Sequence, residues 1–228
     1  YRFDNNGNLL NQVTDGSWAL RSSGGPFWLR QAVVNIDNEH GQVYFTALEK
    51  SSVERHLYRI RFDGSGMERI TKDDGVHKIG FSPNGQYYFD TYSNISTLPA
   101  LVLHGRDGEQ LHVIAKSRPE LLQGLNLQTP ELFTILTSDG FPMPAQILKP
   151  RNFNPGKKYP LIFHIYGGPS APTVFDRWQG TSLFFDNMLL ERGYLVVKFD
   201  HRYATAISKE LENRLTLMVS GPTEIVDI

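Results

Sequence analysis

The sequence predicts an all-β N-terminal part followed by an α/β part, within a chain of 228 residues. In residues up to about 115, short aromatic and β-branched runs alternate with Asn-Gly and Asp-Gly turns. These turns supply the positive φ angles that tight hairpins need. The same part contains an internal repeat. From about residue 127 the pattern changes to near-continuous apolar runs, which are typical of strands buried on both faces.

The repeat indicates the architecture of the first part. The string Gly41-Gln42-Val43-Tyr44-Phe45 returns as Gly85-Gln86-Tyr87-Tyr88-Phe89, a spacing of 44 residues (85 − 41). A period of about 40–50 residues with about four strands in each unit is typical of β-propeller blades. We therefore expect two nearly whole blades after the last strands of an earlier one, with Phe45 and Phe89 at equivalent positions. A β-sandwich with coincidental spacing is the alternative.

Propellers close with roughly 4–8 blades. Two and a half blades would leave strand edges and sheet faces without a partner. We therefore expect the chain to be a piece of a longer protein.

The second part begins with a predicted hairpin. Residues 131–137 and 143–148 are apolar runs on either side of Ser138-Asp139-Gly140. Pro142 and Pro144 lack the N–H that a central strand uses, so they favour an edge position.

A βαβ unit follows the hairpin. Residues 159–166 and 194–200 predict two buried strands, and the apolar positions between 183 and 190 have helical spacing. Gly193 is placed to end that helix. Strand, helix and strand in this order favour parallel pairing. A second helix is expected over 205–218.

Composition excludes several classes of function. Lys plus Arg number 23 and Asp plus Glu 24, a net charge of −1, so there is no basic excess for nucleic acid. The chain has no cysteine, which excludes disulfides, thiolate metal sites and a cysteine nucleophile. No apolar run approaches the roughly 20 residues that cross a bilayer. No membrane span is expected.

The sequence predicts no metal and no cofactor. Phosphate-loop and dinucleotide-loop motifs are missing from the sequence. No two histidines show a ligand spacing with supporting acids. We expect each histidine at the surface or in a turn: His40, His56, His77, His104, His112, His164 and His201.

The sequence contains no G-x-S-x-G nucleophile motif, so the chain presents no catalytic serine of that kind. It does contain Tyr166-Gly167-Gly168-Pro169 directly after a predicted buried strand. Loops at this place in an α/β-hydrolase sheet supply donors to the oxyanion of acyl transfer. Tyr166 therefore has two readings that residue chemistry leaves open: an oxyanion donor, or a half-buried residue that ends the strand.

Several strings together resemble the prolyl oligopeptidase family of serine peptidases. Residues 159–169 carry the resemblance, with 136–140 and 145–150. Within that family, several strings resemble the last propeller blades of the dipeptidyl peptidase IV group: residues 44–49, 54–60 and 69–71, with Thr14-Asp15-Gly16-Ser17-Trp18. The resemblance covers essentially the whole chain in the family's order.

The resemblance implies β-propeller blades over residues 1–126, then the N-terminal part of an α/β-hydrolase domain over 127–228, truncated at both ends. The implied activity is release of N-terminal dipeptides, preferentially Xaa-Pro, by Ser-Asp-His acyl transfer. Tyr166 matches the family tyrosine of the oxyanion hole. The triad is expected beyond residue 228, so the chain alone is expected to be inactive. The implied partner is a peptide with proline at its second position, and the parent is expected to be a homodimer.

Some questions stay open at this point. The parent could instead be a non-catalytic propeller-containing interaction protein, or a prolyl endopeptidase or acylaminoacyl peptidase relative. The resemblance favours a periplasmic or secreted location. After Asp200 the family usually has a glycine-rich turn, whereas this chain has His201-Arg202-Tyr203, which leaves the shape of that loop open.

Overall fold

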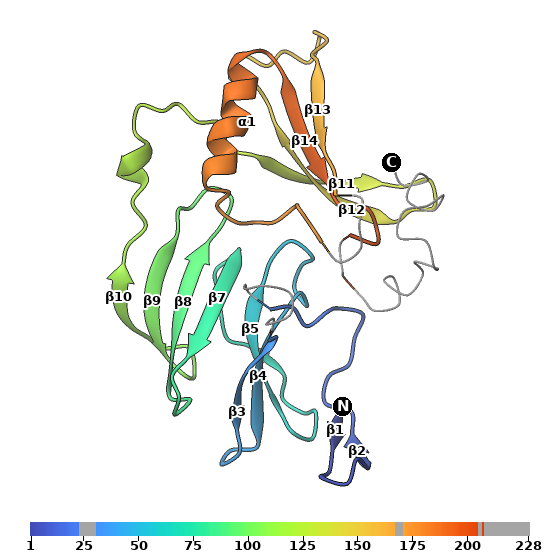
Figure 1. Ribbon diagram of the computed structural model, residues 1–228, viewed down its shortest axis with the longest axis vertical. Helices are drawn as coiled ribbons and strands as arrows, with labels where there is room; N and C mark the ends of the chain where they lie inside the picture. Colours follow the sequence, from blue (N-terminus) through green and yellow to red (C-terminus); the bar gives the residue numbers. More distant parts are fainter. Residues whose placement is uncertain (23–30, 167–170, 205–206, 208–228) are drawn as a thin grey trace. The chain divides into compact units, whose positions relative to one another are not determined.

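A computed structural model of the chain describes residues 1–22, 31–166, 171–204 and 207. The chain divides into two compact units (Figure 1). The first unit comprises residues 1–94 and 99–117, and the second comprises 95–98 and 118–228.

The first unit is built from antiparallel sheets of consecutive strands. A two-stranded sheet comes first, and two four-stranded sheets follow it. The expectation of two four-stranded units after the last strands of another is confirmed. The strands are β1 (Arg2–Phe3) and β2 (Leu9–Asn11); β3 (Val33–Asp37), β4 (Gln42–Ala47), β5 (His56–Arg61) and β6 (Glu68–Arg69); and β7 (Val76–Phe81), β8 (Tyr87–Ser93), β9 (Ala100–Gly105) and β10 (Gln110–Ala115).

The 44-residue repeat holds in the turns but slips by one residue in the strands. Gly41 and Gly85 both precede the second strand of their sheet, with φ angles of 64° and 66°. In the first sheet the ladder to the third strand begins at the next residue, Gln42. In the second sheet it begins one residue later, at Tyr87. The β8–β9 ladder is therefore offset by one residue from the β4–β5 ladder.

A slip of one residue moves every side chain of a strand to the opposite face. Phe45 is buried and stacks on Trp18 and Tyr58, with ring centroids 6.2 and 5.8 Å away. Phe89 is 48% exposed, and Tyr88 turns inward in its place. The expectation that Phe45 and Phe89 are equivalent is therefore wrong, although they lie on equivalent strands.

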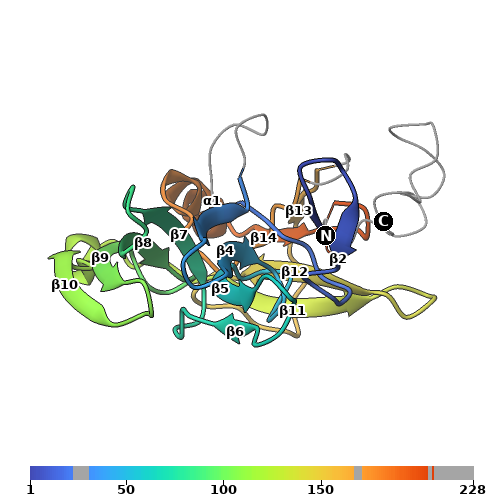
Figure 2. The ribbon, with the colours of Figure 1, turned by 90° about the horizontal axis from the view of Figure 1, so that it is seen from below.

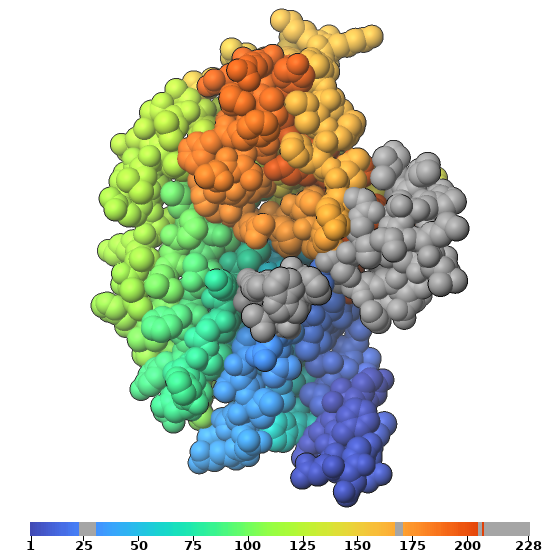
Figure 3. Space-filling view, in the orientation of Figure 1, coloured from blue at the N-terminus to red at the C-terminus, as the bar shows by residue number. Residues whose placement is uncertain are grey.

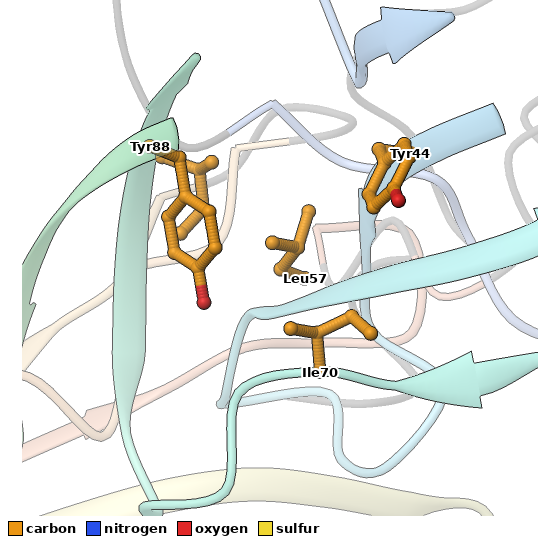
Figure 4. Close-up of a cluster of buried hydrophobic side chains, with 5 residues drawn as sticks. Tyr44, Leu57, Ile70 and Tyr88 are labelled. Carbon is orange, nitrogen blue, oxygen red and sulfur yellow. The ribbon is translucent and has the colours of Figure 1, made fainter. Parts of the chain in front are cut away.

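The two four-stranded sheets share one hydrophobic core. They lie next to each other in Figures 1 and 2, and their blue and green surfaces adjoin in Figure 3. Leu57 and Ile70 pack between Tyr44 of the first sheet and Tyr88 of the second (Figure 4). Ile79 of β7 completes this buried cluster. Burial of these side chains from water is what joins the sheets.

The second unit contains a mixed four-stranded sheet in the order β11-β12-β14-β13. The predicted hairpin and the strand–helix–strand order of the predicted βαβ unit are confirmed, because β11 and β12 pair antiparallel and β13 pairs parallel with β14. The expected burial of both strands holds for β14 but is wrong for β13, which lies at the edge of the described sheet with Leu161 and Phe163 exposed. The elements are a 3₁₀ turn η2 (Pro119–Leu122), β11 (Glu131–Leu136), β12 (Pro142–Leu148), β13 (Leu161–His164), α1 (Thr181–Glu191) and β14 (Leu195–Phe199).

The expected edge position of Pro142 and Pro144 is wrong, because β12 lies between β11 and β14. Pairing of β12 with β14 begins only at Ala145, opposite Phe199. Pro144 accepts a hydrogen bond from the Asp200 N–H at 3.0 Å, so it faces the chain just past the end of β14. Its missing N–H therefore removes no bond from the paired part of the ladder.

Helix α1 covers one face of this sheet. Leu183 and Leu190 of the helix pack on Leu148 of β12 and Val196 of β14. The helix ends at Glu191, and Gly193 follows with a φ of 84°, as its predicted role as a stop requires. The helix expected over 205–218 lies outside the described residues. No helix in the described part of the chain has the length and apolar character to cross a membrane.

Replacing Leu57 by alanine tests the shared core of the first unit. Leu57 is fully buried, so L57A should lower the free energy of unfolding by about 2–5 kcal/mol. L111A is the matched control at a 43% exposed position, where a change within about 0.5 kcal/mol is expected. Urea unfolding followed by circular dichroism measures both. Equal effects would contradict the shared core.

Candidate active-site edge of the second unit

Tyr166 lies at the carboxyl edge of the mixed sheet. It is the second residue after β13, and its side chain is half exposed. Because β13 and β14 run parallel, the residues that follow both strands come to the same edge. Ligands of α/β sheets bind at this edge. Residues 167–170, which include the predicted Gly167-Gly168-Pro169, lie outside the described part.

The residues that follow β14 hold the backbone near Tyr166. His201 donates from Nε2 to the Tyr166 carbonyl oxygen at 3.1 Å. The His201 side chain is fully buried, and the Tyr203 ring packs edge-on against it with centroids 5.9 Å apart. Nδ1 of His201 has no hydrogen-bond partner among the described residues. The ring therefore carries its hydrogen on Nε2, where a donor is needed.

Asp200 binds Thr173 and Val174, which follow residues 167–170 in the sequence. Its carboxylate accepts hydrogen bonds from the Thr173 N–H (2.7 Å), the Thr173 hydroxyl (2.8 Å) and the Val174 N–H (2.9 Å). Burial raises the pKa of Asp200, and these hydrogen bonds oppose that rise. Asp200 and His201 thus hold the backbone after and before the same short segment.

Arg202 ties this edge to the β11–β12 turn. Its guanidinium forms a two-bond fork with Asp139, with both N–O distances 2.8 Å, and lies over the Phe141 ring. The hydrogen bond from Arg202 lowers the pKa of Asp139, and a hydrogen bond from Thr137 adds to the effect. Three consecutive residues after β14 therefore each hold a different loop at this edge.

A buried polar cluster lies beneath α1. Lys198 of β14 forms an ion pair with Asp186 of α1, with Nζ and Oδ2 2.7 Å apart. Lys198 also donates to Gln179 at 3.0 Å, and Gln179 donates to Gln146 at 2.7 Å. Gln146, Lys198 and His164 sit directly opposite one another on adjacent strands. The cluster links α1 to the mixed sheet at strand positions that precede the carboxyl edge where Tyr166 lies.

The sequence placed Tyr166 correctly at a strand end but misjudged several histidines. His56 and His77 are buried within β5 and β7, so the expectation of surface or turn positions is wrong for both. His201 begins a turn, because its carbonyl accepts a hydrogen bond from the Ala204 N–H at 3.0 Å, but its side chain is buried rather than at the surface. His56 and His77 are stabilised by short contacts to acids, with distances of 2.7 Å to Glu54 and 2.6 Å to Asp90. One signal in the sequence could have indicated that His201 is buried: it directly follows the predicted buried strand 194–200.

Tyr203 is the departure that left the loop shape open. It is buried rather than solvent-exposed, and its ring lies against His201. The larger side chain is thus accommodated by packing. The donation of a hydrogen bond by the Tyr166 hydroxyl stays a prediction.

Comparison with known families matches the N-terminal part of the chain. The family model described as "Dipeptidyl peptidase IV (DPP IV) N-terminal region" matches residues 1–99. The chain is also similar to a "Probable dipeptidyl-aminopeptidase B" of Emericella nidulans, with 33% identity over 197 residues. A protein of the same description from Aspergillus clavatus is 32% identical over 198 residues.

The alignments cover most of this chain but little of the relatives. Each covers 83% of this chain and 20% of the fungal protein, so the chain spans about a fifth of the length of these curated relatives. The crystal structure of Porphyromonas gingivalis dipeptidyl peptidase 4 matches 88% of this chain and 27% of its own, with a TM-score of 0.73 and 24% identity. That similarity concerns the fold.

Removing one partner of the buried ion pair should strongly destabilise the second unit. In K198M, Asp186 is left buried without its cation, which costs about 3–5 kcal/mol of unfolding free energy. In K198M/D186L no charge is left in the pair, so most of that loss should be recovered. K149M removes the exposed pair with Glu131 and should change stability by no more than about 1 kcal/mol. Urea unfolding compares the three variants, and a double variant no more stable than K198M would contradict the ion-pair argument.

Proposed function

The chain is dipeptidyl peptidase IV-like in sequence and in fold, and from this premise we propose that it is part of a serine exopeptidase that releases dipeptides from peptide N-termini. The substrate class is a peptide with proline at its second position. On this proposal, residues 1–126 contribute the last blades of a β-propeller. Residues 127–228 contribute the start of an α/β-hydrolase domain.

The observation that carries the proposal is the position of Tyr166. A half-exposed phenol stands at the carboxyl edge of a sheet with parallel β13 and β14, as the second residue after β13. Its backbone is held by His201, so its side chain projects from a fixed point. Acyl transfer needs a donor at such an edge, aimed at the oxygen that becomes negatively charged.

In the proposed mechanism, a Ser-Asp-His triad carries out acyl transfer and Tyr166 stabilises the oxyanion. A serine attacks the carbonyl carbon of the second substrate residue, while a histidine oriented by an aspartate takes the serine proton. The carbonyl oxygen then becomes an oxyanion, and the Tyr166 hydroxyl donates a hydrogen bond to it. The histidine returns the proton to the leaving amine, and water later hydrolyses the acyl-enzyme. Of these groups, the proposal assigns Tyr166 to this chain.

Replacing Tyr166 by phenylalanine in the full-length protein tests the oxyanion role. The hydroxyl acts only where negative charge develops, so Y166F should lower kcat by about 10²–10³-fold with little change in KM. The ring is retained and is half exposed, so the melting temperature should stay close to wild type. Steady-state kinetics on a Xaa-Pro anilide and a thermal melt measure these quantities.

Y159F is the matched control. The Tyr159 hydroxyl accepts a hydrogen bond from the Asn154 N–H at 2.9 Å, away from the carboxyl edge. Y159F should therefore reduce stability modestly and leave kcat within about twofold of wild type. A kcat of Y166F within about threefold of wild type would defeat the oxyanion assignment.

The 228-residue chain by itself should be catalytically silent, because its sequence contains no G-x-S-x-G nucleophile motif. Without the triad only a small residual rate is expected. Incubation with a fluorophosphonate probe should label no serine, and Gly-Pro-nitroanilide should not be turned over. Labelling of one specific serine would show that the chain carries its own nucleophile.

A further inference from the structure

We infer that His201 is a positioning residue for Tyr166, an inference that rests on the proposed function. His201 does not touch the substrate in this role. It fixes the peptide group from which the Tyr166 side chain projects, and through it the place of the phenolic hydroxyl.

The contact joins the segments that follow β13 and β14, beyond the last paired residues of the two strands. The last β13 residue paired with β14 is His164, two residues before Tyr166. Beyond that pair, the hydrogen bond from His201 Nε2 to the Tyr166 carbonyl, at 3.1 Å, replaces the ladder. It therefore extends the parallel β13–β14 connection up to Tyr166. It thereby ties the Tyr166 backbone to the segment that follows β14.

His201 is itself firmly held. Its side chain is fully buried, and its ring packs against Tyr203 at an interplanar angle of 61°. The preceding residue, Asp200, donates its N–H to Pro144 and accepts three hydrogen bonds from Thr173 and Val174. Because the His201 ring is already held by these contacts, it loses little further side-chain conformational entropy when it binds the Tyr166 carbonyl.

The chemistry of the reaction explains why such support matters. An oxyanion donor must lie about 2.7–3.1 Å from the developing charge. A displacement of about 1 Å in a catalytic group can cost roughly 10²-fold in rate. The Tyr166 side chain is half exposed, so packing alone does little to fix it. A hydrogen bond to its own peptide group is the constraint that the described residues provide.

The ring presents a donor where the Tyr166 carbonyl lies. Nδ1 is buried and has no partner among the described residues, whereas Nε2 carries the hydrogen that the carbonyl oxygen accepts. A glutamine side chain can also present an N–H at similar reach, whereas leucine fills similar space without a donor. At position 201, glutamine therefore keeps the hydrogen-bond donor and leucine removes it.

The test is a double-mutant cycle in the full-length protein with a Xaa-Pro anilide. H201L should lower kcat by about 10-fold to 100-fold with KM within about threefold, and H201Q should restore kcat to within about threefold of wild type. In the Y166F background, H201L should lower kcat by less than about twofold, because the hydroxyl that His201 positions is already missing. H112L, at an exposed histidine, is the matched control and should behave as wild type.

The outcomes separate the two proposals. If Y166F retains near-normal kcat, the oxyanion role fails, and the positioning role fails with it. If Y166F loses activity but H201L does not, only the positioning role is overturned. Equal loss from H201L with and without the Tyr166 hydroxyl would also overturn it, because a general structural defect is additive. If H201L does not fold, H201N replaces it: its amide is too short to reach the carbonyl, so normal kcat in H201N overturns the inference.

Discussion

Parallel pairing of β13 with β14 is the constraint on which the candidate site depends. Antiparallel strands would send the residues after each strand to opposite edges, whereas these two strands deliver Tyr166 and the Asp200–Tyr203 segment to one edge. A parallel connection needs a crossover element, and α1 provides it. The hydrogen bond between His201 and Tyr166 is possible only because the chain makes this crossover. Local turn chemistry alone could not bring residues 35 positions apart into contact.

The same crossover carries a buried ion pair. Removing Lys198 and Asp186 from water costs energy that their attraction offsets only with good geometry and further hydrogen bonds. Both conditions are met, since Lys198 contacts Asp186 at 2.7 Å and Gln179 at 3.0 Å. Apolar packing of Leu183 and Leu190 tolerates small rotations of the helix, whereas the ion pair has one favourable alignment. We regard the pair as fixing the alignment of α1 on the sheet.

In the first unit, packing between sheets overrides the sequence repeat. The best alignment of the two repeats pairs Phe45 with Phe89, yet the core contains Tyr44 and Tyr88, which approach it from facing sheets. The β8–β9 ladder is offset by one residue from the β4–β5 ladder, and this reverses the inward and outward sides of β8. An offset of one residue in pairing is invisible to a comparison of short apolar runs. It decides which side chains are buried.

The sequence by itself determined the order of elements. Turn glycines, apolar periodicity and the 44-residue spacing predicted the all-β part, the hairpin, the βαβ unit and the strand end that bears Tyr166. These features depend on residues close together in the chain. Only the tertiary structure decided that β12 is central despite its prolines, that His201 is buried, and that Tyr203 packs on it. Each of these features depends on contacts with a segment that is distant in the sequence. A local sequence pattern does not contain the identity of that segment.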